Sequence, residues 1–267
     1  MASGGVASPT DRLTNTQFST DELVAIVEEA AAAGTYVAAH AYTPKAIERA
    51  LHCGVRSIEH GNYLDEDTAR LMAAKKAILV PTLVTYQELA RGGAAAGMPQ
   101  ELVAKVGDAL EAGLKSLAVA HNAGVQMAFG SDLLGDLHPA QGLEFELRSR
   151  VLPAADVIRS ATTTCAELFG MQYSLGHVRP GYAADLLLLA PGADPLADPA
   201  VLAAPGGRAV AAVFKAGLLA KAPAVAALQG RGGSEGQVQE AEAEAGAGGE
   251  WGVWAALNER LFPAAAW

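Results

Sequence analysis

The sequence has little of what marks secreted, membrane-spanning or disulfide-rich proteins. Its 267 residues include two cysteines, Cys53 and Cys165, which lie far apart and form no C-x-x-C pair. Neither a disulfide framework nor a structural zinc knuckle is therefore predicted. No apolar run approaches the roughly 20 residues that span a bilayer, and the first ten residues lack the basic region and apolar core of a signal peptide. We therefore expect a cytoplasmic or otherwise reducing compartment.

Basic residues are also in the minority. The chain has 19 lysines and arginines against 29 aspartates and glutamates, a formal net charge of −10. This charge disfavours binding to nucleic acid or to an anionic membrane. Apolar residues are abundant and make up 51% of the chain, which is enough for a substantial globular core. The length alone would fit one complete (β/α)8 barrel, which takes roughly 250 residues.

The N-terminal part contains two units with the same order of elements. Each has an amphipathic helix, a glycine, a short apolar strand and a histidine, with the same glycine-to-histidine spacing in both. The strands are expected over 35–39 and 55–59, and they lead to His40 and His60. Alternation of helices and strands predicts a parallel sheet with helices outside it, an α/β fold.

The alternation continues through the middle of the chain. Further elements are expected in this order: a helix from Asp65, a strand over 77–80, a helix over 100–122, a strand over 125–129, and helices over 140–151 and 154–169. Residues 85–99 are rich in alanine and glycine and are predicted to form a loop. Asp132 follows the strand over 125–129, as His40 and His60 follow theirs.

Beyond residue 175 the pattern changes to short strands. One is expected over 184–189, and the segments 208–214 and 217–221 are typical of a β-hairpin. The rest is rich in glycine, alanine and glutamate and is predicted to be disordered. The predicted organisation is an α/β body over 1–175, a small β appendage over 176–221 and a low-complexity acidic tail over 222–267.

Three candidate site residues stand at the ends of predicted parallel strands. In a parallel α/β barrel these ends converge on one mouth, so His40, His60 and Asp132 can meet although they are distant in sequence. Neutral imidazole and carboxylate are ligands of catalytic zinc sites. A single histidine at a strand end is more often structural. Here a histidine stands at the end of two successive predicted strands, and this repetition favours a metal site.

Several segments together resemble the amidohydrolase superfamily, most closely its imidazolonepropionase-like and prolidase-like members. They are GTYVAAHAYTPKAIERALHCGVRSIEHGNYLDEDTARLMA, LVPTL and MAFGSDLLGDLHP, followed by VIRSATTTCAELFGM, GHVRPGYAADLLLL and VFKAG. The resemblance covers roughly residues 1–221. It implies that the chain contains strands five to eight of a (β/α)8 barrel, which is a partial TIM barrel. These strands would form the C-terminal half of such an enzyme, together with part of the family's β domain.

The resemblance also implies a chemistry. His40 and His60 match metal ligands on strands five and six, and Asp132 matches the strand-eight aspartate that contacts metal and carries a proton from the attacking water to the leaving amine. A divalent metal is implied, Zn²⁺ first, with Mn, Fe or Co as alternatives. The implied reaction is hydrolysis of an amide or peptide-like C–N bond in a small molecule by metal-activated water.

Two further residues are candidates for contact with substrate. Tyr42, two residues after His40, is a candidate donor to a substrate carbonyl, with an interfacial aromatic as the alternative. His138, six residues after Asp132, is a candidate for binding substrate or supporting the metal, with a surface-loop histidine as the alternative.

The chain also departs from the family pattern. The family's first strand carries an H-x-H pair of metal ligands, and this sequence has none. The family's fourth strand carries a lysine that bridges two metal ions. The segment that follows this lysine in the family resembles the residues from Met1 onward, so the lysine has no counterpart here. We therefore expect a truncated chain with an incomplete metal site and impaired activity. Open barrel edges would also favour self-association.

Two alternative functions stay open on the sequence alone. One is a non-catalytic half-barrel remnant that acts as an interaction protein, with Trp251 and Trp254 of the tail contacting a partner. The other is a deaminase that acts on a cyclic C–N bond and uses the same barrel.

Overall fold

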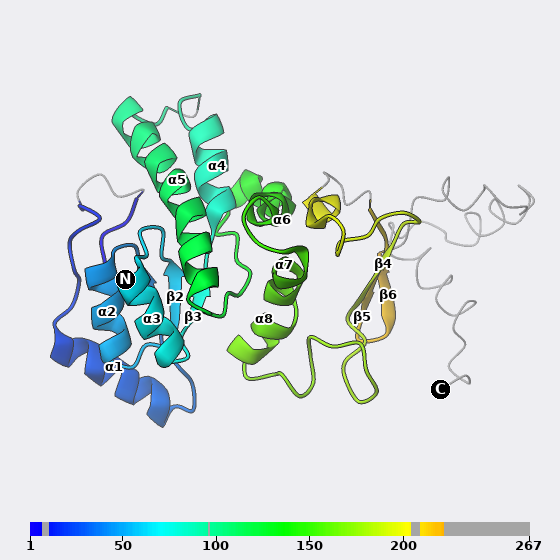
Figure 1. The fold of residues 1–267 in the computed structure, drawn as a ribbon, viewed down its shortest axis with the longest axis horizontal. Helices are drawn as coiled ribbons and strands as arrows, with labels where there is room; N and C mark the ends of the chain where they lie inside the picture. The colour runs from blue at the N-terminus through cyan, green and yellow to red at the C-terminus, as the bar shows by residue number, and fades with distance from the viewer. Residues whose placement is uncertain (7–10, 96, 204–208, 222–267) are drawn as a thin grey trace, which may run out of the picture. The chain divides into compact units, whose positions relative to one another are not determined.

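The computed structural model of the chain describes residues 1–6, 11–95, 97–203 and 209–221 (Figure 1). These residues form two compact units, the first from Met1–His177 and 194–203, the second from 178–193 and 209–221. The tail predicted over 222–267, including Trp251 and Trp254, lies outside the described residues. Within the described part of the chain, no helix is long and apolar enough to cross a membrane.

A parallel sheet of three short strands forms the centre of the first unit. The strands are β1 (Ala38–Ala41), β2 (Ser57–His60) and β3 (Ile78–Val80), in the order β1-β2-β3. Ser57 pairs with Ala38 on one side and with Ile78 on the other. The parallel arrangement predicted from the helix–strand alternation is thus confirmed.

The strand expected over 125–129 is reduced to a single bridge. Leu79 and Met127 form an isolated parallel bridge. Around it, the amide of Leu79 donates to the carbonyl of Gln126 at 2.9 Å, and the amide of Ala128 donates to the carbonyl of Leu79 at 2.8 Å. The segment therefore follows the edge of β3 in the predicted direction without becoming a regular strand.

Helices flank this sheet along the chain (Figure 1). They are α1 (Thr20–Ala32), α2 (Pro44–His52), α3 (Glu66–Ala74), α4 (Leu83–Gly92), α5 (Gln100–Asn122), α6 (Leu143–Ser149), α7 (Ala154–Ala161) and α8 (Thr163–Leu168), with 3-10 helices η1 (Gly135–Gly142) and η2 (Pro199–Ala203). The predicted start of α1 is a capping box, in which Ser19 Oγ accepts from the amide of Glu22 and the Glu22 carboxylate accepts from the amide of Ser19.

The prediction of a loop over 85–99 was wrong, because most of that stretch belongs to α4. The helix buries Leu83, Val84 and Tyr86 along one side, and this apolar face gains its stability from tertiary packing. The glycine- and alanine-rich composition that suggested a loop begins only at Gly92, where the helix ends.

Two helices predicted near the end of the first unit are shorter than expected. The helix predicted over 140–151 begins at Leu143, because the preceding 3-10 segment contains Pro139, which has no amide to donate. The helix predicted over 154–169 breaks at Thr162, whose backbone is at φ −126° and ψ −89°. Its hydroxyl donates to the carbonyl of Ile158 at 2.8 Å, a bond that competes with regular helix.

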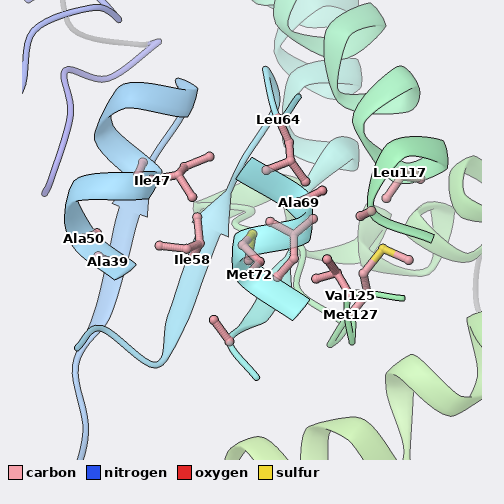
Figure 2. Close-up of a cluster of buried hydrophobic side chains, with 14 of the residues drawn as sticks. Ala39, Ile47, Ala50, Ile58, Leu64, Ala69, Met72, Leu117, Val125 and Met127 are labelled. Atoms are coloured by element: carbon pink, nitrogen blue, oxygen red, sulfur yellow. The ribbon is translucent and has the colours of Figure 1, made fainter. Parts of the chain in front are cut away.

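The main core of the first unit joins helices to the sheet. Ile47 from α2, Ile58 from β2 and Met72 from α3 meet in one cluster, which Figure 2 shows with Leu117 of α5. Each is at most 2% exposed, and burial of such a side chain contributes about 1.5–3 kcal/mol. This packing holds the strand ends that carry the candidate site.

Helix α5 packs closely at Gly113 against Leu83 of α4 and against Asn62 in the loop after β2. A Cβ atom there would lie 2.5 Å from Leu83 Cδ2 and 2.9 Å from Asn62 Nδ2. We expect Gly113→Ala to lower the free energy of unfolding by about 1–3 kcal/mol, because overpacking outweighs alanine's helix propensity. Gly107→Ala is the control, since that site is open within 4 Å, and should add up to about 1 kcal/mol. Equal effects of the two substitutions in urea denaturation would contradict the close approach.

The second unit contains an antiparallel sheet of β4 (Leu186–Leu189), β5 (Val210–Lys215) and β6 (Leu218–Lys221), in that order. The predicted hairpin is present, and Ala216 and Gly217 form its turn at φ 51° and 81°. Asp185 supports the turn, because its carboxylate accepts from the amide of Ala216 at 2.8 Å.

Candidate metal and substrate site

The parallel register brings the two predicted histidines together. His40 lies on β1 and His60 ends β2, one residue beyond the point where Glu59 pairs with His40. Their ring centroids are 4.3 Å apart and the rings are nearly perpendicular, at 76°. Nε2 of His40 is buried and has no hydrogen-bond partner among the described residues. A buried imidazole nitrogen with a free lone pair is suited to bind a metal ion.

Burial keeps both histidines neutral. It lowers the pKa of His40 to about 4, with a smaller contribution from the charged amino group of Met1. It lowers the pKa of His60 to about 3, with a smaller contribution from His40. Metal ions bind the unprotonated nitrogen of neutral imidazole, so both rings are in the binding form at neutral pH.

Two of the candidate residues have a strained backbone, as do Phe18, Lys76 and Ala216 elsewhere in the described residues. His60 has φ 78° and Asp132 has φ 50°, in the left-handed region that costs a non-glycine residue about 1–3 kcal/mol. Next to His60, the carbonyl of Gly61 accepts from Ser116 Oγ at 2.7 Å. Asn62 Nδ2 donates to the carbonyl of Ala109 at 2.7 Å. Helix α5 thereby fixes the loop that follows His60.

A pocket of about 230 Å³ opens beside the histidine pair. Its lining residues come from the N-terminal segment, β1, α4 and the loop after residue 129: Met1, Gly5, Val6, His40, Tyr42, Thr85, Tyr86, Leu89 and Asp132. Asp132 is an exposed residue, and desolvation of its carboxyl by the surrounding pocket raises its pKa. His138 is exposed on η1 and is not among the lining residues.

The described residues fit a metal ion in part. Two imidazole rings lie close together, but no group of three or more His, Cys, Asp or Glu side chains in the described ranges could hold a metal. Asp132 shares the pocket with His40 without completing a ligand set. Since a catalytic zinc takes three protein ligands, the two histidines supply part of a site.

Tyr42 is one of the pocket-lining residues, and it has a partner that the sequence did not reveal. Its ring stacks on that of His60 at 5.1 Å and 5°, and its hydroxyl lies 2.9 Å from the hydroxyl of Tyr86. Burial raises the pKa of Tyr42 to about 12 and also raises that of Tyr86. Both hydroxyls therefore keep their protons.

Sequence reasoning also missed Thr82. Its Oγ1 lies 2.7 Å from Nδ1 of His60, and the side chain is 5% exposed. A signal was present, since Thr82 stands just after β3 while His40 and His60 stand at the ends of β1 and β2, and Tyr86 comes one helical turn later.

Comparison with known proteins identifies the family. A profile described as the amidohydrolase family matches residues 1–220. The ochratoxinase of Aspergillus niger is 36% identical over 227 residues, which are 84% of this chain and 46% of that protein.

Solved structures agree with this match. A prolidase complexed with N-methylphosphonate-L-proline is 53% identical, with a TM-score of 0.79 over 83% of this chain and 53% of its own. A Xaa-Pro dipeptidase with bound methionine in the active site is 30% identical, with a TM-score of 0.72 over 82% of this chain and 53% of its own. The chain thus spans about half the length of these relatives. The chain belongs to the amidohydrolase family, which implies a TIM-barrel-like α/β fold.

Proposed function

We propose that the chain supplies His40 and His60 as metal ligands to a hydrolase that cleaves an amide or peptide-like C–N bond. The observation that carries the proposal is the buried, unpartnered Nε2 of His40, in a ring 4.3 Å from that of His60 beside a pocket. A divalent ion would supply Lewis-acid activation of water and of the scissile carbonyl. Zn²⁺ is the ion proposed first, because it binds imidazole and carboxylate ligands.

The other pocket residues have roles that follow from their chemistry. Asp132, whose pKa is raised by desolvation of its carboxyl, is proposed to accept a proton from the attacking water and to deliver it to the leaving amine. Tyr42 lines the pocket with a protonated hydroxyl and is proposed to donate to the substrate carbonyl. His138 stays a candidate for a contact with a larger substrate.

The proposed substrates are small dipeptide-like amides. Support comes from the prolidase and the Xaa-Pro dipeptidase among the relatives. The pocket of about 230 Å³ is below the roughly 300–1,000 Å³ of typical ligand pockets, which favours a small ligand. We further propose that the sheet corresponds to strands of a partial barrel, and that its two histidines need ligands from other residues for full activity. Self-association through strand edges is one way to supply them.

Metal titration tests the proposed function. We expect the chelator-treated chain to bind Co²⁺ or Zn²⁺ weakly, because two imidazoles are an incomplete ligand set, and His40→Ala to bind about tenfold more weakly or worse. His52→Ala is the matched control, since His52 is exposed at the end of α2, away from the pocket. Calorimetry and the visible spectrum of Co²⁺ report the binding, and proline release from Xaa-Pro dipeptides reports turnover.

If the unsubstituted chain and His40→Ala bind metal equally, the histidines are not ligands and the non-catalytic alternative is favoured. Loss of binding in His52→Ala to the same degree would instead mean that the titration reports surface histidines.

A further inference from the structure

The N-terminal segment that lines the pocket is fixed at its beginning to β1. Residues 2–6, the wall segment, are buried. The amide of Ala2 donates to the carbonyl of His40 at 2.8 Å, and the amide of Tyr42 donates to Ser3 Oγ at 3.1 Å. The strand that carries His40 therefore also holds the start of the wall segment.

Lys105 of α5 holds the other end of the wall segment. Its ammonium group donates to the carbonyl of Gly5 at 3.2 Å and to that of Asp11 at 3.5 Å. Asp11 belongs to the returning part of the chain, which runs antiparallel to the wall segment, since Ser3 and Thr16 form an antiparallel bridge. Two carbonyl oxygens that converge on one point repel each other unless a donor lies between them, and an ammonium group has three N–H donors. One lysine thus joins both parts of the N-terminal segment to α5.

The wall segment contributes to an apolar end of the pocket. Val6 lines the pocket together with Tyr86 and Leu89 of α4. Val6 and Tyr86 are both 2% exposed and belong to one apolar cluster, against which Leu89 packs. Among the described residues that line the pocket, none is a lysine or an arginine, and Asp132 is the one carboxylate. This end of the pocket therefore suits an uncharged, apolar group.

We propose that Lys105 is a positioning residue that fixes the wall segment relative to α4, so that the pocket accepts a small, uncharged apolar side chain between Val6 and Leu89. The helix that carries Lys105 is itself fixed to α4, because Val106 of α5 lies in the same apolar cluster as Val6 and Tyr86. That the accepted side chain belongs to an amide substrate rests on the proposed function, whereas the clamp and the apolar subsite rest on the contacts of the wall segment.

The charge of the lining predicts which ligands are excluded. A carboxylate side chain placed between Val6 and Leu89 would lose its water without gaining a cationic partner from the lining side chains. It would also share the pocket with Asp132, a group of the same charge. We therefore expect leucyl-proline to bind about tenfold more tightly than aspartyl-proline, or better still.

Amide hydrogen exchange of the metal-free chain tests the clamp. The amide of Gly4 donates to the carbonyl of Asn15, and the amide of Gln17 donates to the carbonyl of Ala2, each at 3.0 Å, so both amides report whether the N-terminal segment stays closed. Lys105→Met removes the ammonium group and should make their exchange about tenfold faster or more, because a charged hydrogen bond is lost. Lys105→Arg, which keeps N–H donors, should restore slow exchange.

Lys115→Met is the matched control, since Lys115 lies on the same helix with a side chain that is 80% exposed. That variant should leave both amides at the exchange rate of the unsubstituted chain. Equal rates in Lys105→Met and Lys115→Met would overturn the clamp. Lys105→Gln, whose shorter side chain cannot reach both carbonyls, takes the place of Lys105→Met should that variant not fold.

Titration of the methyl-labelled chain locates the ligand. Leucyl-proline should shift the ¹³C-methyl signals of Val6 and Leu89, and aspartyl-proline at the same concentration should leave them in place. The affinity for leucyl-proline should fall about three- to tenfold in Lys105→Met, because the wall segment is no longer pre-organised for binding. Lys105→Arg and Lys115→Met should keep the affinity of the unsubstituted chain.

The outcomes separate this inference from the proposed function. Shifts of Val6 and Leu89 that weaken in Lys105→Met support the inference even if the chain binds no metal and releases no proline, in which case the proposed function is the part that fails. Equal binding of the two dipeptides, or no shift at either residue, overturns the apolar subsite. An unchanged affinity in Lys105→Met overturns the positioning role of Lys105, whatever the exchange rates.

Discussion

Replacing Arg148 by methionine is expected to lower the free energy of unfolding by about 3–5 kcal/mol. Arg148 and Glu144 are both fully buried on α6, and Nε of the arginine lies 2.8 Å from Oε1 of the glutamate. Removing the guanidinium would leave a buried carboxylate without its counter-charge. Burial already raises the pKa of Glu144 to about 6 against the opposing effect of Arg148, so the variant should protonate Glu144 near neutral pH.

The arginine also connects backbone segments next to the candidate site. Its guanidinium donates to the carbonyl of Pro81 at 2.7 Å and to that of Ala128 at 2.9 Å. Glu144 in turn accepts from the amide of Val84 at 2.8 Å. Thr82 follows Pro81 directly, so the ion pair fixes the segment from which Thr82 reaches His60. We therefore expect the variant to weaken the site as well as the fold.

Arg150→Met is the matched control for this prediction. Arg150 pairs with Glu146 at 2.7 Å on the same helix, but both side chains are about half exposed, at 50% and 44%, and an exposed pair of this kind contributes about 0.3–0.5 kcal/mol. Urea denaturation at pH 7 compares the two variants. Equal losses would mean that Arg148 is not the buried centre of the network.

The contrast between these two pairs shows where sequence analysis reaches its limit. Glu144–Arg148 and Glu146–Arg150 have the same residue types at the same i, i+4 spacing. Local pattern cannot distinguish them, because burial depends on which face of α6 meets the rest of the unit. The helix itself was predictable, whereas the role of its charges was not.

The fold and the histidine pair were more accessible to prediction. Short apolar strands alternating with amphipathic helices predict a parallel sheet, and parallel strand ends lie at one edge. This was sufficient to bring His40 and His60 together. It was not sufficient for Asp132, whose position depends on the loop after a segment that forms a single bridge with β3. Thr82 and Tyr86 were missed because their importance comes from long-range hydrogen bonds.

The second large effect is expected on acidification of the metal-free chain. Folding lowers the pKa of His40 and His60 from 6.5 to about 4 and about 3. Between those values and 6.5 the unfolded chain binds more protons than the folded chain. The free energy of unfolding should therefore fall as the pH falls from about 6.5 toward 4, by up to about 1.4 kcal/mol per pH unit for each histidine. Above pH 6.5 this contribution is fully present.

His60→Gln isolates the larger of the two contributions, because its amide cannot take up a proton in this range. We expect urea denaturation with chelator between pH 5 and 7 to give a slope shallower than that of the unsubstituted chain, by up to about 1.4 kcal/mol per pH unit. His52→Gln should keep the original slope, since that residue is exposed. Unchanged slopes in both variants would show that carboxylates, and not the buried imidazoles, determine the acid sensitivity. A slope that becomes shallower only in His60→Gln would show that folding holds this ring neutral, as metal binding requires.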